Sequence, residues 1–247
     1  MDITYSHSDS ADADYRALLL KLITDLGAKR ICELGGGANP ALESAFIQER
    51  GISYTILDIS PEELAKAPEG YETKVADVSA ERPPCEGEFD LVFSHMLAEH
   101  VKNGPQLHKN VFAMLRPGGK ALHYFPTLYS LPMLANRLLP ERIGSMILAF
   151  VQPGREAHGK NAKFPAYYTW CRGPMKRQIR RFESLGFTIK SYRGFFGHAE
   201  YYQKFPAMQR INHEVSRWLL RHPIPWLTTK AFLLLEKPAE HFSETQS

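Results

Sequence analysis

The stretch RICELGGGANP, residues 30–40, decides the fold of this chain. An apolar run leads into Glu33, and Gly35, Gly36 and Gly37 follow shortly after it in a row. Glycine adopts positive φ angles, and its lack of a side chain lets a ligand come close to the backbone. A plain tight turn would need only one glycine. The stretch therefore predicts a buried strand followed by a turn that binds a compact polar ligand.

Strand-like and helix-like segments alternate on both sides of this turn. Short runs of apolar residues predict strands, whereas apolar residues spaced three and four apart predict helices. The expected strands are residues 30–34, 53–59, 72–78, 89–96, 120–125, 188–196 and 230–238, and the expected helices are residues 14–27, 40–51, 61–67, 105–119 and 173–187. Such alternation is typical of a parallel sheet with helices on both faces. We therefore expect an α/β fold with a doubly wound, mostly parallel, seven-stranded sheet.

Two segments interrupt this alternation. Residues 126–170 are rich in proline, leucine, tyrosine and phenylalanine and show no clear strand pattern, and residues 197–227 are again irregular and aromatic. We expect one domain over residues 1–247, in which residues 126–170 form a cap over the substrate. Residues 197–227 would form a second insertion before the last strand. Loops at such clefts often close to exclude water.

The composition argues against several classes of protein. The 247 residues carry a net charge of only +3, which does not favour nucleic acid as the main partner. No stretch reaches the about 18 uninterrupted apolar residues of a membrane span, and the polar N-terminal residues do not resemble a secretory signal. The three cysteines lack the spacing of metal ligands and indicate a reducing compartment. We therefore expect a cytoplasmic protein.

Three carboxylates follow three successive strands of the expected sheet. In an open parallel sheet, ligands bind beyond the carboxyl ends of the strands, where Glu33, Asp58 and Asp77 would lie. Asp58 could bind both hydroxyls of a ribose, as in either a nicotinamide enzyme or an adenosylmethionine enzyme. A dinucleotide fingerprint requires a third glycine where this chain has Pro40, and Glu33 would repel a pyrophosphate but hold an ammonium. The three carboxylates therefore suit an amino acid, a ribose and an adenine in that order.

Four motifs carry a resemblance to a known family: ELGGGANP at residues 33–40 with Asp58, ADV at 76–78, FDLVFSHMLAEHV at 89–101 and MLRPGGKALHYFP at 114–126. In this order and at this spacing, the chain resembles the class I S-adenosylmethionine-dependent methyltransferases, in the type 11/12-like small-molecule branch. The resemblance covers residues 28–126. It departs from the family at Asn39, where a glycine is frequent.

The resemblance implies S-adenosylmethionine as the cofactor and assigns residues to it. The methionine part would be held by Glu33, Gly35, Gly36, Gly37 and Asn39, the ribose by Asp58 with Ile59, and the adenine by Asp77 and Val78. Ser94 and His95, at the end of the fourth expected strand, would border the methionine and the transferred methyl group. These assignments agree with the chemistry of the three carboxylates.

The stretch SHMLAEHV, residues 94–101, contains the candidate catalytic residues His95, Glu99 and His100. Methyl transfer requires an aligned nucleophile, and a neutral hydroxyl also requires a base. His95 and Glu99 are four residues apart, so a helical turn would place them on one face. The three residues could form a base, a divalent metal site or both, or Glu99 and His100 could simply fix the loop. No further acidic cluster is visible, so we expect no metal and favour His95 as the base.

The acceptor is expected in an aromatic cleft beyond the fifth strand. The candidate substrate-binding residues are Tyr124, Tyr129, His158, Tyr167, Tyr168 and Trp170. Aromatic side chains with scattered basic residues suit a sugar or an apolar small molecule better than a nucleic acid, although most of these aromatics could instead cover the sheet. The basic run KRQIRR, residues 176–181, is expected to be the solvated face of a helix.

These observations predict a small-molecule methyltransferase that acts on an oxygen atom of a sugar, a glycan or a secondary metabolite. The alternatives are an N- or C-methyltransferase, an enzyme acting on a lipid at the membrane surface, and an RNA methyltransferase. A non-catalytic protein that binds S-adenosylmethionine as the partner of an active homologue is a further alternative. Residues 131–151 combine apolar stretches with arginines and could touch a membrane without spanning it. An oligomer is also compatible with the sequence.

Overall fold

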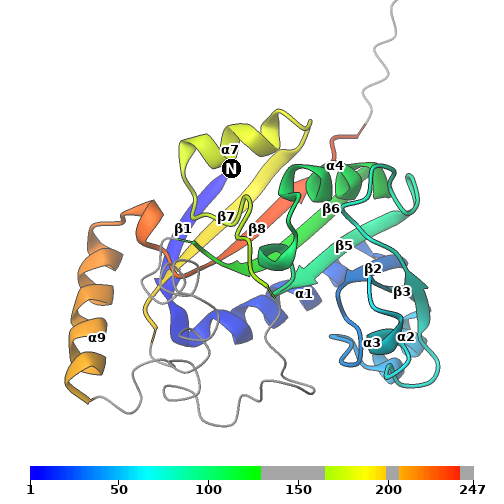
Figure 1. The fold of residues 1–247 in the computed structure, drawn as a ribbon, viewed down its shortest axis with the longest axis horizontal. Coiled ribbons are helices and arrows are strands. Elements are labelled where there is room, and N and C mark those ends of the chain that lie inside the picture. Colours follow the sequence, from blue (N-terminus) through cyan, green and yellow to red (C-terminus); the bar gives the residue numbers. More distant parts are fainter. Residues whose placement is uncertain (129–164, 199–205, 240–247) are drawn as a thin grey trace, which may run out of the picture.

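The computed structural model describes residues 1–128, 165–198 and 206–239 of the chain. Most of the expected cap, including Tyr129, His158 and the apolar stretch 131–151, lies outside these residues. The described part holds one continuous sheet with helices on both of its faces (Figure 1). The expected α/β fold is therefore confirmed.

Within the described residues, the sheet has eight strands in the order β1-β7-β8-β6-β5-β2-β3-β4. The strands are β1 (Asp2–His7), β2 (Arg30–Leu34), β3 (Ser53–Asp58), β4 (Glu72–Val75), β5 (Phe89–His95), β6 (Leu115–Pro126), β7 (Thr188–Phe196) and β8 (Lys230–Glu236). β8 pairs antiparallel with β6 and β7, and the other pairs of this sheet are parallel. The strand order reverses between β2 and β5, which is where ligands bind in open parallel sheets.

The sheet has eight strands rather than the expected seven because the N-terminal residues form an edge strand, β1. This strand pairs parallel with β7, and its register places Tyr5 beside Gly194. The ring of Tyr5 stacks on Phe196 with centroids 5.4 Å apart. β1 is exposed or only half-buried along its whole length. Its polar composition, which argued against a secretory signal, therefore also concealed the strand.

The described residues form six helices, some of which begin or end at residues that satisfy the backbone. They are α1 (Ala11–Leu26), α2 (Ser44–Arg50), α3 (Pro61–Leu64), α4 (Gly104–Met114), α7 (Lys176–Glu183) and α9 (Pro206–Arg221), with 3₁₀ turns η1 (Ser8–Ser10), η2 (Ala98–His100) and η3 (Pro225–Leu227). Gly27 and Gly51 end α1 and α2 with φ angles of 54° and 58°, a left-handed conformation that favours glycine. The side chains of Ser60 and Asn103 cap the first turns of α3 and α4.

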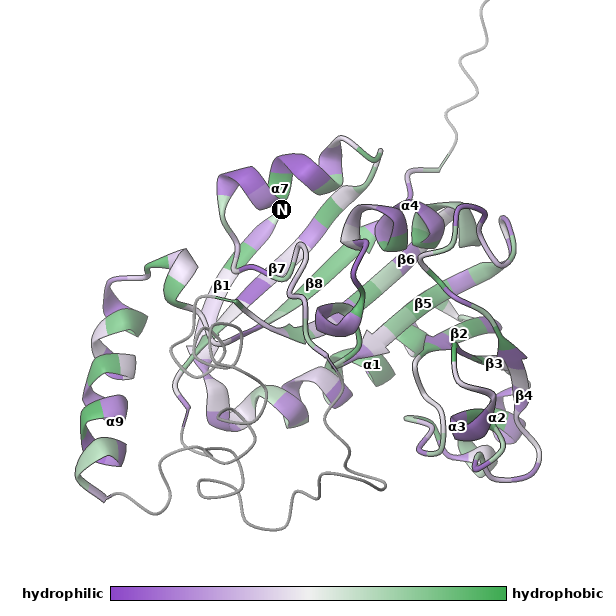
Figure 2. Cartoon of the chain, in the orientation of Figure 1, coloured by the Kyte–Doolittle hydropathy of each residue, from purple (hydrophilic) through white to green (hydrophobic). Residues whose placement is uncertain are grey.

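Two apolar layers hold the helices on the sheet. α4 and α7 pack on one face through residues such as Val111 and Phe182. α1 and α3 pack on the other face through residues such as Leu19 and Leu64. The central strands are buried over residues 89–94 of β5 and 121–126 of β6, as is typical of a parallel sheet covered on both faces. Figure 2 shows these strands as mainly hydrophobic. This packing fixes the carboxyl ends of the strands where the cavity opens.

Four of the expected helices are shorter in the structure: those expected over residues 40–51, 61–67, 105–119 and 173–187 correspond to α2, α3, α4 and α7. The helix expected over residues 40–51 begins later, with α2. The backbone N–H of Ala41 donates instead to the Glu33 carboxylate at 3.1 Å, which holds the preceding residues in a loop. The helix expected over residues 105–119 ends at Met114, where β6 begins.

The expectation that residues 197–227 are irregular is wrong over the part that the structure describes as a helix. This insertion contains the 16-residue helix α9. The apolar residues Met208, Ile211, Val215 and Trp218 recur three and four positions apart, which is a helical spacing. This spacing was present in the sequence, but the polar residues between them masked it.

Candidate active site

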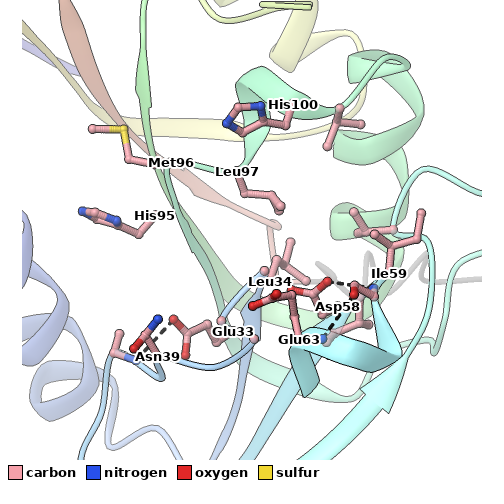
Figure 3. Close-up of a pocket in the computed structure, with 18 of the residues that line it drawn as sticks. Glu33, Leu34, Asn39, Asp58, Ile59, Glu63, His95, Met96, Leu97 and His100 are labelled. Carbon is pink, nitrogen blue, oxygen red and sulfur yellow. Dashed lines mark hydrogen bonds between the residues drawn. The ribbon is translucent and has the colours of Figure 1, made fainter. Parts of the chain in front are cut away.

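A cavity of about 890 Å³ opens beyond the carboxyl ends of β2, β3 and β5 (Figure 3). Its volume lies at the upper end of the range of about 300–1,000 Å³ that small-molecule sites occupy. One face of α1, the glycine turn and the segments that follow β3, β4 and β5 line it, together with Pro165 and Tyr167. The space suffices for a cofactor and a small acceptor.

Each of the three glycines in the turn is required by the local geometry. Gly35 and Gly37 have φ angles of 75° and 43°, which side chains rarely allow. A Cβ atom on Gly36 would lie 2.6 Å from the carboxyl carbon of Glu33, and one on Gly35 would lie 2.6 Å from Leu97 Cδ1. The turn therefore brings bare backbone to the cavity wall, as the sequence predicts.

Glu33 lies beside this turn, with only 3% of its surface exposed. Its carboxylate accepts hydrogen bonds from the Ala41 N–H at 3.1 Å and from the Tyr54 hydroxyl. Burial raises the pKa of Glu33 to about 7, although both hydrogen bonds favour the charged form. A cation that enters the cavity here would compensate a buried negative charge. The surroundings of Glu33 therefore fit an ammonium group.

Asp58 and Asp77 line the cavity at the ends of β3 and β4. One oxygen of Asp58 accepts a hydrogen bond from the Ser60 N–H at 2.9 Å. One oxygen of Asp77 accepts from both the backbone N–H and the hydroxyl of Ser79, each at 2.8 Å. An ionised carboxylate has about four acceptor positions, so these bonds orient each group without exhausting it. Both carboxylates can therefore still accept hydrogen bonds from a ligand.

All residues expected to bind the cofactor line this cavity except Ser94. The lining includes Glu33, Gly35, Gly36, Gly37, Asn39, Asp58, Ile59, Asp77 and Val78. The Ser94 side chain is buried, and its hydroxyl lies 2.8 Å from Nδ1 of His123 in the core. Its backbone carbonyl accepts a hydrogen bond from the Tyr15 hydroxyl at 3.1 Å. Ser94 thus supports the cavity wall from behind.

His95 lines the cavity where β5 ends, and its side chain is 42% exposed. Its Nε2 lies 3.2 Å from Oδ1 of Asp12, while the rings of Tyr15 and Tyr124 pack at 5.2 and 5.0 Å from its own. The second oxygen of Asp12 accepts a hydrogen bond from the Tyr124 hydroxyl at 3.4 Å and pairs with Lys230 at 3.5 Å. Within the part of the chain that the structure describes, Nδ1 of His95 makes no hydrogen bond. Asp12 therefore holds the His95 ring through Nε2 and leaves Nδ1 without a partner among the described residues.

The helical turn expected to place His95 and Glu99 on one face does not form. Met96 has a φ angle of 53°, and the 3₁₀ turn η2 follows it. The Glu99 side chain is 5% exposed and does not line the cavity, and burial raises its pKa to about 8. Its backbone carbonyl accepts the N–H groups of Tyr167 and Tyr168. Glu99 thus fixes the segment around Tyr167 through its backbone carbonyl, and its side chain does not face the cavity.

His100 lines the cavity but does not converge with His95. Its Nδ1 lies 2.9 Å from the carbonyl oxygen of Pro165, and its Nε2 lies 3.6 Å from Oε1 of Glu99. Figure 3 shows the His95 and His100 rings well separated, with Met96 and Leu97 between them in the chain. Over residues 1–128, 165–198 and 206–239, no three His, Cys, Asp or Glu side chains are grouped to hold a metal ion.

Of the candidate acceptor-binding residues that the structure describes, only Tyr167 lines the cavity. Tyr124 and Tyr168 are 0% and 2% exposed and pack in the core. The ring of Trp170 stacks on His108, with centroids 5.9 Å apart, beneath α4 and α7. These three aromatics cover the sheet and do not line the cavity. The sequence did not reveal this, because composition alone cannot distinguish a buried aromatic from one that faces a cleft.

The wall of the cavity near His95 is instead formed by α1, which the sequence reasoning missed. The lining residues Asp12, Tyr15, Arg16, Leu19 and Leu20 follow the spacing of one helix face. That spacing was visible, but it does not show which segment the face covers. Asp12 meets His95 across 83 positions in the chain, so no local motif joins them.

The sequence that builds this cavity matches a known protein family. Residues 9–191 match a family model described as a methyltransferase domain. The chain belongs to the class I S-adenosylmethionine-dependent methyltransferases. The matched residues include the glycine turn, the three carboxylates and His95. S-adenosylmethionine is accordingly the cofactor of this methyltransferase.

Solved structures share the fold at low sequence identity. An S-adenosylmethionine-dependent methyltransferase from Mesorhizobium loti is 18% identical with a TM-score of 0.50, over 89% of this chain and 96% of that one. One from Archaeoglobus fulgidus is 15% identical with a TM-score of 0.53, over 90% and 92%. A phosphoethanolamine N-methyltransferase 2 from Haemonchus contortus is 17% identical with a TM-score of 0.53, over 90% of this chain and 53% of that one. A search of curated protein sequences finds no match.

Proposed function

We propose that this methyltransferase acts on a hydroxyl group of a small molecule, with His95 as the general base. The observation that carries the proposal is the half-exposed ring of His95 at the cavity, held through Nε2 by Asp12. The Nδ1 atom is then the one that can accept a proton from an acceptor hydroxyl. A histidine that only completed the core would be buried, as His108 and His123 are.

Three carboxylates would hold the cofactor, one by its negative charge and two by accepting hydrogen bonds. Glu33 would pair with its ammonium, Asp58 would bind the ribose hydroxyls and Asp77 the adenine amino group. The buried charge of Glu33 and the bare backbone of the glycine turn fit this assignment. When bound, S-adenosylmethionine supplies a methyl group that is already activated. The remaining tasks of the chain are to align the acceptor and to take its proton.

Asp12 would be a positioning residue that acts through His95. A hydrogen bond from Nε2–H of His95 to Asp12 leaves Nδ1 without a proton, which is the tautomer that a base requires. The Asp12 carboxylate, 3.2 Å away, would also stabilise the positive charge that His95 gains. Lys230 and the Tyr124 hydroxyl hold the other oxygen of Asp12 in place.

The lining of the cavity near His95 suits an acceptor with an apolar or ring-shaped body. Tyr15, Leu19, Leu20 and Met96 supply apolar surface, and Arg16 supplies a cation. Such a wall can contact the ring of a sugar or of a hydroxylated secondary metabolite while leaving one hydroxyl toward His95. We therefore propose an acceptor of this class.

N-methylation of a small amine that carries a phosphate is a second candidate. Arg16 and Lys102 place two cations on the lining of the cavity, where they could bind a phosphate. The Haemonchus contortus structure is that of a phosphoethanolamine N-methyltransferase. An amine acceptor also loses a proton, so His95 would keep its role in this reaction.

A screen of acceptors tests the proposal and separates the two candidates. The protein is incubated with S-adenosylmethionine and sugars, phenolic metabolites or phosphoethanolamine, and release of adenosylhomocysteine is measured. With the acceptor found, His95→Ala should lower turnover by about 10²- to 10⁴-fold. The control His100→Ala, which removes another cavity histidine, should have a much smaller effect.

Three outcomes would contradict the proposal. Wild-type turnover in His95→Ala would exclude this residue as the base. Turnover of phosphoethanolamine alone would select the N-methyltransferase. Tight binding of adenosylhomocysteine with no turnover of any acceptor would support a non-catalytic binding protein.

A further inference from the structure

Helix α9 carries a stripe of large apolar side chains that is not buried against the sheet. The stripe consists of Met208, Ile211, Val215 and Trp218, which are 49%, 64%, 49% and 53% exposed. They lie three, four and three positions apart, so they share one side of the helix. Figure 2 shows hydrophobic and hydrophilic bands alternating along α9. Single exposed apolar residues are ordinary, whereas these four side chains form a contiguous apolar strip along one helix.

The helix is attached to the domain by a different side. Ser216 and Leu219 are its buried residues. The side chain of Asn212 accepts a hydrogen bond from the backbone N–H of His198 at 3.2 Å. These contacts place α9 against β1 and β7, at the edge of the sheet in Figure 1. The stripe is therefore not the face that holds the helix on the sheet.

Basic residues gather on another side of α9. Because successive residues are about 100° apart around a helix, Arg210, Arg217 and Arg221 point in similar directions. All three are exposed. Glu214 is the one acidic residue of this helix, and it accepts a hydrogen bond from Arg217 at 2.6 Å. α9 thus combines an apolar side with a net positive side.

We propose that α9 docks this protein onto an anionic phospholipid surface. The stripe would enter the boundary between headgroups and acyl chains, and the arginines would extend to the phosphates. Trp218 suits this depth because its ring is apolar and its N–H can remain hydrated. Trp226 in η3, just beyond the end of α9, is a second half-exposed tryptophan, at 52%. The arginines make the surface complementary in charge to anionic lipid.

The size of the stripe favours a membrane over a second copy of the chain. A helix of 16 residues is about 24 Å long and about 10 Å wide, which gives a footprint of about 240 Å². A stable protein interface buries about 800 Å² on each partner. An interfacial helix needs only its own apolar face and flanking cations. No helix in the described residues is long and apolar enough to cross a bilayer.

Vesicle flotation tests the proposal without knowledge of the enzyme's substrate. The full chain is mixed with vesicles of phosphatidylcholine alone, or with an equal part of phosphatidylglycerol, at 50 and 500 mM salt. Wild type should float with the anionic vesicles at low salt and remain at the bottom with phosphatidylcholine alone. Ile211→Ser/Trp218→Ser and Arg210→Glu/Arg221→Glu should each lower the partition coefficient by about tenfold or more.

Two matched controls separate α9 from general surface properties. Val75→Ser removes an apolar side chain that is 56% exposed on the distant edge strand β4. Arg177→Glu/Arg180→Glu reverses two exposed charges in the basic run of α7. Both should float as wild type does. If the α7 variant lost flotation and the α9 variants did not, the proposal would be wrong.

The remaining outcomes also decide the proposal. A wild-type protein that never floats would overturn it. So would a dimer, measured by light scattering, that Ile211→Ser/Trp218→Ser dissociates, because the stripe would then bind a second copy. A clear fall in Tm for the same variant would show that the stripe is covered by the chain itself. The arginine variant leaves the stripe intact, so it keeps the test decisive if the serine variant does not fold.

Discussion

The cofactor side of the cavity and the side around His95 are built in different ways. On the cofactor side, Asp58 and Asp77 each stand at the end of a strand and are oriented by backbone N–H groups two residues further on. Around His95, the groups come from α1, β5, β6 and β8 and hold one another through side-chain contacts. A change of one side chain should therefore disturb the second region more widely than the first.

The largest of these effects is expected at Asp12. Asp12→Asn keeps the size of the side chain but removes the charge that stabilises a protonated His95, and its amide can select the wrong tautomer. Turnover should fall by about tenfold to 10²-fold, a share of the 10²- to 10⁴-fold that a positioned base contributes. The apparent affinity for adenosylhomocysteine should not change.

A matched control for Asp12 is available two positions along the same helix. Asp14 pairs with Arg193 at 3.4 Å and does not line the cavity. Asp14→Asn should therefore leave turnover near wild type. Nitrogen NMR of His95 provides a second readout, since wild type should show a protonated Nε2 and Asp12→Asn a mixture. An unchanged tautomer together with unchanged turnover would remove Asp12 from the mechanism.

A smaller effect is expected at Glu99, whose buried side chain does not line the cavity. Burial raises its pKa from an ordinary 4.5 to about 8, so the folded chain retains a proton that the unfolded chain has lost. The stability this contributes is complete below about pH 4.5 and is lost as the pH rises through 8. Between pH 6 and pH 9, the free energy of unfolding of wild type should fall by about 2 kcal/mol more than that of Glu99→Gln.

Urea unfolding at the two pH values measures this difference. The control Glu183→Gln alters an exposed carboxyl group on α7 and should follow wild type. Parallel pH profiles for wild type and Glu99→Gln would show that Glu99 is ionised in the folded protein. The assignment of Glu99 as a buried, neutral side chain would then be wrong.

The smallest expected effect is a pH dependence of ligand binding, which tests the assignment of Glu33 to the cofactor side of the cavity. The pKa of Glu33 is raised to about 7 by burial, so most molecules carry a neutral Glu33 at pH 6 and a charged one at pH 7.5. Because an ammonium binds the charged form, affinity for adenosylhomocysteine should rise by about tenfold from pH 6 to pH 7.5. Calorimetry should find this rise in wild type and in Glu63→Gln, another cavity carboxylate, but not in Glu33→Gln. A rise that persists in Glu33→Gln would assign the pH dependence elsewhere.

The difference between the two regions also explains what the sequence could reveal. Glu33, Asp58 and Asp77 follow strands whose apolar runs are plain, and the rule that parallel strands end at one edge places them together. Asp12 and Lys230 are brought to His95 only by the packing of α1 and the insertion of β8, which no spacing records. Sequence reasoning therefore placed the carboxylates and His95 at the ends of the strands, but it did not indicate that Asp12 and Lys230 lie beside His95.

The same limit applies to the fold. β2 and β7 were predicted with their observed bounds because they are buried or alternate clearly. β1 was missed because an exposed edge strand depends on main-chain pairing with a distant segment. Tyr168 and Trp170 were assigned to the acceptor because aromatic composition is the same in a core and in a cleft. Burial, which only the structure gives, separates the two.

One paired titration tests the central claim that the cavity has a cofactor side and a separate base. Adenosylhomocysteine is titrated calorimetrically into wild type, Asp58→Ala and His95→Ala. Loss of a hydrogen bond to a charged group costs about 1.5–3 kcal/mol, so Asp58→Ala should bind about 10- to 100-fold more weakly. His95→Ala should bind within about twofold of wild type. Wild-type affinity in Asp58→Ala, or an equal loss in both variants, would contradict the account.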